Sequence, residues 1–149
     1  MSRAVARNAA MQMIFERLGG GQGGEETLQM VYNELREEGN TAVSPQDPGV
    51  KDLAYIQAAL QGVIEHLDEI DEKIGKYARN WTVDRMPAVD RTILRLAAWE
   101  ILYGQAWDVP GQVAIKEAVT LAKTYANEDS GRFINGVLGS LLRDNEAAQ

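Results

Sequence analysis

Apolar residues recur at helical spacing through almost the whole sequence, and the alternation of apolar and polar residues that is typical of strands is hard to find. Residues 3–18 illustrate the pattern: at about 100° per residue, their apolar side chains cover most of the circumference and indicate a helix largely enclosed by others. The chain has 149 residues and is 45% hydrophobic, which suffices for one core of ordinary size. We therefore expect an all-α fold.

Clusters of Gly, Pro and polar residues divide the helical pattern into segments. The run GGGQGG at 19–24 predicts a flexible connector, residues 39–49 predict a loop, and NWTVDRMP at 80–87 predicts a second break. A third helix should bury Leu53, Ile56, Leu60, Val63 and Leu67, and a fourth should carry Ile70, Ile74 and Tyr77. The other helices are expected over 25–38, 88–105 with Pro87 in its first turn, 112–126, and a last one capped by Ser130.

These segments make six or seven helices in two groups. We expect two helical bundles packed into one compact domain, with an N-terminal subdomain at 1–79 and a C-terminal subdomain at 80–149. The sequence has no apolar stretch of membrane-spanning length and no secretory signal pattern, and it has no cysteine. A cytoplasmic protein without a membrane role is the expectation.

The residues needed for enzyme chemistry are scarce. The single histidine, His66, lies on a predicted helix, where a solvated or partly packed ring is favoured over a general base. Without cysteine a zinc site is disfavoured, and the glycine run lacks the Lys-Ser/Thr of a phosphate loop. The five carboxylates within 65–72 are interpreted as a solvated face. We expect no catalytic residue, no metal and no cofactor.

The net charge of −7 argues against non-specific binding of nucleic acid, but charge is local. The first helix carries three arginines against one acid, and at helical rotation Arg3, Arg7 and Arg17 fall within an arc of about 80°. An acidic protein with a small basic edge is the resulting hypothesis.

Four ordered blocks of the sequence carry a resemblance. They are ARNAAMQMIF at 6–15, WTVDRMPAVDRTILRLAAWE at 81–100, VPGQVAIKEAVTLAKTY at 109–125 and EDSGRFINGVL at 128–138. In order and spacing they resemble the NusB family of bacterial transcription antitermination factors. The resemblance implies an all-helical fold of two subdomains and a non-enzymatic role in RNA binding. It also implies a complex with NusE, a ribosomal small-subunit protein, on the boxA sequence of nascent ribosomal RNA leaders, which acts on the RNA polymerase elongation complex.

The resemblance also implies site residues. The RNA-binding positions would be Arg3, Arg7 and Phe15 of the first helix and the basic–aromatic pair Arg132 and Phe133. Such residues suit single-stranded RNA, because guanidinium groups contact phosphates and aromatic rings stack on bases. Asp90 and Asp129 would face NusE, where carboxylates suit a basic protein. The dense N-terminal arginine run of many family members is reduced here to Arg3 and Arg7, and Lys116 replaces a common Asn. We therefore expect RNA binding to depend on NusE.

Several alternatives remain open at this point. Phe133 could be a core residue, Asp129 could serve only the helix dipole, and Arg91 and Arg95 could form surface ion pairs. The tryptophans are interpreted as core anchors; they are Trp81, Trp99 and Trp107. Alternative functions are an RNA-binding accessory domain related to rRNA cytosine methyltransferases, or a self-associating scaffold, since some family members form homodimers.

Overall fold

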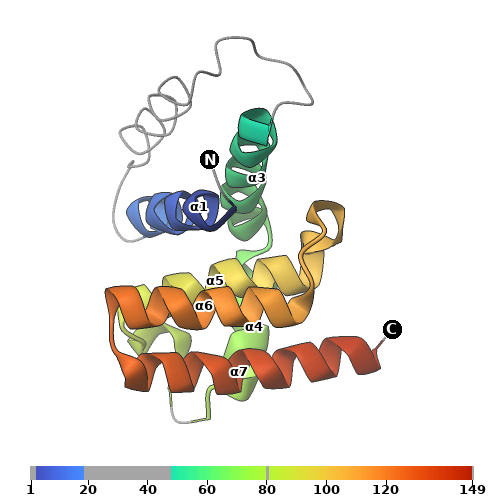
Figure 1. Ribbon diagram of the computed structural model, residues 1–149. Coiled ribbons are helices and arrows are strands. Elements are labelled where there is room, and N and C mark those ends of the chain that lie inside the picture. The colour runs from blue at the N-terminus through green and yellow to red at the C-terminus, as the bar shows by residue number, and fades with distance from the viewer. Residues whose placement is uncertain (1–2, 19–47, 80, 149) are drawn as a thin grey trace. The chain divides into compact units, whose positions relative to one another are not determined.

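The structure of the chain, a computed structural model, describes residues 3–18, 48–79 and 81–148, with 48–50 described by their backbone only (Figure 1). Every regular element in these ranges is helical, which confirms the all-α expectation. The expected connector at 19–24, the helix at 25–38 and residues 39–47 of the expected loop lie outside the described residues. Contacts define two compact units, Met1–Gln61 and Gly62–Gln149, and each is described by itself.

The first unit contains α1 (Arg3–Leu18), as expected, and most of α3 (Pro48–Glu65). Its alanine-rich α1 suits close packing, because alanine favours helix and adds little bulk. Arg3 links the two helices: its Nε lies 3.5 Å from Asp52 Oδ1, and its guanidinium lies 4.7 Å from the centre of the Tyr55 ring. Fully buried side chains of this unit are Ala6, Ala10, Ile14, Tyr55, Ile56 and Ala59.

The boundary between the units falls inside α3, earlier in the sequence than the boundary expected between 79 and 80. Because the α3 helix continues across this unit boundary, the sequence has no break or change of composition there that could have marked it. The third helix ends at Glu65, and Leu67, expected on its inner face, begins α4 instead. His66, between the two helices, is half-buried and stacks on Tyr103 with ring centres 4.1 Å apart.

The second unit is a helical bundle around α5 (Figure 1). Its helices are α4 (Leu67–Tyr77), the 3₁₀ helix η1 (Val83–Arg85), α5 (Ala88–Tyr103), the 3₁₀ helix η2 (Gly104–Trp107), α6 (Gly111–Tyr125) and α7 (Glu128–Ala147). α5 contacts α4, α6 and α7, while α6 and α7 run antiparallel as neighbours. In the described ranges, no helix combines the length and the apolarity that a membrane crossing requires.

α5 is buried around its whole circumference from residue 92 to residue 101. The expected apolar stripe is confirmed at Ile93, Leu96, Ala97 and Ile101, whereas Val89 is half-buried. The burial also takes in polar side chains of α5, namely Thr92, Arg95 and Glu100. A helix surrounded by others needs partners for such groups, and the α4 side of the bundle supplies one.

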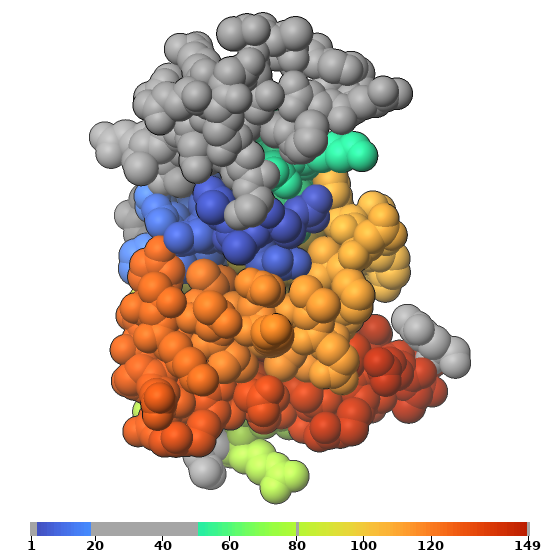
Figure 2. All heavy atoms as spheres, in the orientation of Figure 1, coloured from blue at the N-terminus to red at the C-terminus, as the bar shows by residue number. Residues whose placement is uncertain are grey.

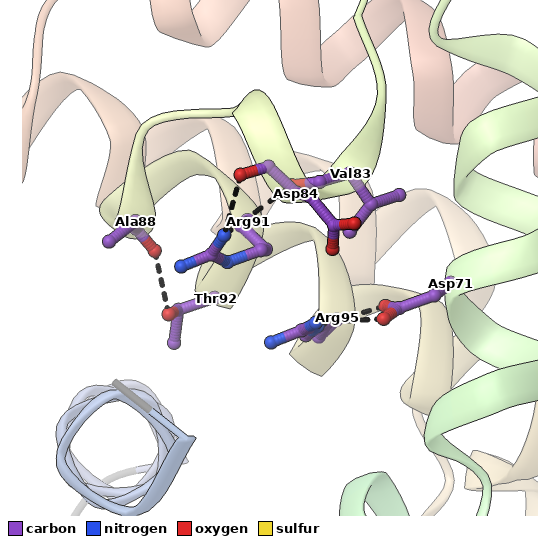
Figure 3. A network of polar contacts seen from close by, with 7 residues as sticks. All are labelled: Asp71, Val83, Asp84, Ala88, Arg91, Thr92 and Arg95. Atoms are coloured by element: carbon purple, nitrogen blue, oxygen red, sulfur yellow. Dashed lines mark hydrogen bonds and ion pairs between the residues drawn. The ribbon is translucent and has the colours of Figure 1, made fainter. Parts of the chain in front are cut away.

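That partner is Asp71 of α4, which accepts two hydrogen bonds from Arg95, at 2.9 Å from Nε and 2.7 Å from Nη2 (Figure 3). The Arg95 side chain is only 10% exposed, so the hypothesis of a surface ion pair is wrong for this arginine. Tyr103 of α5 likewise donates to Glu69 of α4, and burial together with Glu69 raises the pKa of Tyr103 to about 12. The acidic row of α4 is therefore partly engaged with α5 and is not a wholly solvated face.

Arg91, one turn before Arg95, has a different role. Its Nη1 donates to the backbone carbonyls of Val83 at 3.5 Å and Asp84 at 3.4 Å (Figure 3). Arg91 thereby ties η1 to the start of α5, which begins at Ala88 as expected, with Pro87 at the cap position just before the first turn. The expected break at 80–87 thus contains an ordered 3₁₀ turn.

The tryptophans differ in burial. Trp99 is 4% exposed and is a core anchor as expected, but Trp81 is 49% exposed, so the interpretation is wrong for this residue. Trp81 follows the end of α4, where it lies on no apolar helix face. Trp99 leaves no room beside Gly62, since a Cβ at Gly62 would overlap its indole Nε1.

Candidate nucleic-acid interface

The candidate site is built on the corner where α6 ends and α7 begins. Asn127 is the N-cap of α7: its side chain accepts a hydrogen bond from the Ser130 N–H at 2.8 Å. The expectation that Ser130 caps this helix is therefore wrong, because the cap lies three residues earlier. Ser130 also lowers the pKa of Asp90, which lies in the first turn of α5.

Arg132 and Asp129 form an exposed ion pair on the first turns of α7. Their side chains are 71% and 86% exposed, respectively, and they lie three residues apart on one helix. Exposed pairs of this kind contribute little to stability, about 0.2–0.5 kcal/mol, so water or a ligand can replace either partner. Arg132 can thus exchange its carboxylate for a phosphate without disturbing the fold.

Aromatic rings accompany this basic residue. Phe133 is half-buried, so the structure supports neither a fully enclosed core residue nor a freely exposed ring. Tyr125, the last residue of α6, is 41% exposed and was not among the expected site residues. Its signal was an aromatic residue at a helix end directly before a charged turn. Figure 2 shows α6 and α7, orange to red, as a continuous outer surface of the second unit.

Asp90 is placed differently from Asp129. It lies in the first turn of α5, is 5% exposed, and burial raises the pKa of its carboxyl, while the hydrogen bond with Ser130 opposes that rise. Its Oδ1 has no hydrogen-bond partner among the described residues. A buried oxygen in that position can accept one further hydrogen bond from a donor that reaches the start of α5.

The α1 positions lie in the first unit. Arg7 is 4% exposed, so its guanidinium offers little surface, whereas Phe15 is 39% exposed. The Arg3 side chain is 32% exposed and already faces Asp52 and Tyr55. Because Arg7 and Arg132 belong to different units, their convergence on one face stays a prediction.

Among residues 3–18, 48–79 and 81–148, no three His, Asp or Glu side chains gather as ligands for a metal ion. The chemical capacity of the corner is recognition: an exchangeable guanidinium, two aromatic rings that reach solvent and an exposed carboxylate lie within one short segment of α6 and α7.

Comparison with known proteins gives one consistent family. A model of the NusB family matches residues 4–143. The transcription antitermination protein NusB of Symbiobacterium thermophilum is 39% identical over 148 residues, covering 99% of this chain and 94% of that protein. NusB of Arthrobacter sp. strain FB24 is 39% identical over 143 residues, covering 94% and 92%.

Solved structures agree with these relatives. T. maritima NusB is 29% identical, with a TM-score of 0.75 over 97% of this chain and 92% of that one. A crystal structure of the antitermination factors NusB and NusE in complex with double-stranded RNA is 26% identical, with a TM-score of 0.70 over 95% and 96%.

Proposed function

The chain belongs to the NusB family, and we propose that it acts as a transcription antitermination factor that binds boxA-type RNA of ribosomal RNA leaders together with NusE. The role is non-enzymatic and cytoplasmic, and it affects the RNA polymerase elongation complex indirectly, through the RNA. The related complex of NusB, NusE and RNA supports both partners.

The observation that carries the RNA-binding proposal is the exposed corner of α6 and α7. Arg132 is 71% exposed in a weak pair, and Phe133 follows it half-buried. A guanidinium and an accessible ring on one turn of a helix suit a nucleotide, because phosphate and base are recognised by different groups. We add Tyr125 to this RNA surface and keep Arg3, Arg7 and Phe15 as the proposed contribution of α1.

The NusE side of the proposal rests on the two aspartates. Asp129 is exposed and offers a charge that suits a basic ribosomal protein. Asp90 offers the buried oxygen that lacks a partner among the described residues, at the start of α5. The charge of Asp129 would attract the basic NusE and favour association, while Asp90 would accept one specific hydrogen bond from it.

The test is a titration of labelled boxA RNA with this chain, with NusE, and with both. We expect weak binding by the chain alone and tight binding by the mixture, because the chain carries a net charge of −7. Arg132→Ala should weaken ternary binding and lower the magnitude of the salt slope by about 0.7–1. Arg143→Ala is the matched control, since Arg143 lies on the same helix and donates to Ser140. Tight binding by the chain alone, unchanged by NusE, would contradict the proposal.

A further inference from the structure

The second unit has another surface, which contains none of the residues proposed to bind RNA or NusE. A cavity of about 510 Å³ opens beside the end of α4, lined by Gly75, Ala78, Arg79, Trp81, Thr82 and Val83. Gly75 has no side chain to fill the cavity, and a Cβ there would meet only Val83, at 3.9 Å. The indole of Trp81, 49% exposed, forms one side. In Figure 2 the yellow-green end of α4 and the segment after it project at the lower edge of this unit.

Backbone hydrogen bonds are made by described residues on this cavity's rim. The Trp81 N–H donates to the Ala78 carbonyl at 3.1 Å, and the Arg85 N–H donates to the Thr82 carbonyl at 3.0 Å. Met86, 4% exposed, anchors the end of η1 in the core. Arg91 also donates to two carbonyls of η1, the helix that begins two residues after Trp81 (Figure 3).

The charge around Trp81 identifies the kind of ligand. Arg79 and Arg85 are exposed, and within the described residues neither guanidinium has a hydrogen bond or an ion pair. Asp84 is the single acid between them. Two uncommitted guanidinium groups favour an anionic ligand, and an accessible indole favours one with flat rings.

We propose that Arg79, Trp81, Thr82 and Arg85, named here the Trp81 surface, bind a single-stranded stretch of RNA that extends beyond boxA. One unpaired base stacks on the indole within the cavity, and the flanking phosphates meet the two guanidinium groups. This inference rests on the proposed RNA-binding function. α5 packs against α7, and η1 ends only three residues before α5 begins, so one RNA strand can follow both surfaces.

The experiment uses the full chain with NusE and two labelled RNAs, boxA alone and boxA with a single-stranded extension. Trp81→Ala should weaken binding of the extended RNA about 5- to 150-fold, the range for loss of one stacked base, and leave boxA alone unchanged. Trp81→Tyr should restore most of the affinity, since it keeps a ring. Arg79→Ala and Arg85→Ala should each lower the magnitude of the salt slope by about 0.7 for the extended RNA only. Arg143→Ala serves as the charge-matched control.

Tryptophan fluorescence gives an independent reading. In a Trp107→Phe background the exposed Trp81 indole should be quenched by the extended RNA, while the buried Trp99 contributes a constant signal. If Trp81→Ala leaves the binding of both RNAs unchanged while Arg132→Ala weakens it, the Trp81 surface is overturned and the proposed function stands. If NusE alone changes the Trp81 signal and RNA does not, the surface belongs to a protein contact and the inference fails. Absence of binding to either RNA by the wild-type mixture would overturn both proposals.

Discussion

Asp129→Asn separates the two roles proposed for the α6–α7 corner. Asp129 pairs with Arg132 on an exposed turn, where such a pair contributes about 0.2–0.5 kcal/mol. Removing it frees Arg132 for phosphate at roughly that gain. It also removes a repulsion between carboxylate and phosphate that, at about 8 Å in screened water, adds about 0.2–0.3 kcal/mol. The binary affinity for RNA should therefore rise about two- to fourfold.

The same substitution should weaken the NusE complex, because it removes the exposed carboxylate that we propose faces this basic protein. Fluorescence anisotropy with labelled boxA RNA measures the first effect, and calorimetry with NusE measures the second. The gain in RNA affinity should disappear in an Arg132→Ala background, since it acts through that guanidinium. Glu128 remains in the first turn of α7 to favour the helix dipole, so the melting temperature should change little. A clear loss of RNA affinity with NusE binding intact would refute the reasoning.

Two further predictions concern the fold that carries the site. Burial raises the pKa of Asp90 in the folded state, so ionisation of this carboxyl lowers the stability of the fold above that pKa, and the loss disappears as the pH falls through it. Asp90→Asn should therefore raise the melting temperature at neutral pH, with a gain that shrinks towards pH 4. A gain that is the same at all pH values would argue against this origin. Gly62→Ala should lower the free energy of unfolding by about 1–3 kcal/mol, because the added Cβ overlaps Trp99. Gly136→Ala should raise the free energy of unfolding by about 0.5–1 kcal/mol, because a Cβ there meets nothing. Urea unfolding of both variants measures the contrast, and equal effects would contradict it.

Helical periodicity predicted most of the fold, because burial imposes a pattern on apolar side chains. The bounds of α1 and the start of α5 follow the sequence, and the apolar stripe of α5 is buried as expected. The same pattern gave no indication of the Arg95–Asp71 pair, since residues 24 positions apart meet only after packing. Ser130 was a reasonable cap by residue type, but Asn127 is one too, and only the geometry distinguishes them.

The candidate site was less accessible to sequence reasoning. The charged turn before α7 marked Arg132 and Asp129, and both are exposed there. Asp90 is buried and Asp129 is exposed, although both are aspartates in the first turn of a helix and look alike in the sequence. Trp81 was expected in the core because of its size. It lies in a turn rather than on the apolar face of a helix, and nothing in the sequence pattern directs its side chain into the core. Tyr125 was missed because helical spacing alone does not tell a buried end of a helix from an exposed one.

The α6–α7 pair also has a consequence for the order of folding. Only Ala126 and Asn127 separate the two helices, so closing the hairpin costs little chain entropy and needs no distant segment. Contacts this local form early in folding, ahead of pairings between residues far apart in the chain. Gly131 lies within the hairpin, where an added Cβ would meet Val119 and Lys123 at 3.5 Å. The proposed site residues at this corner are thus aligned by an element expected to form early, and substitutions that loosen this hairpin should slow refolding more than they speed unfolding.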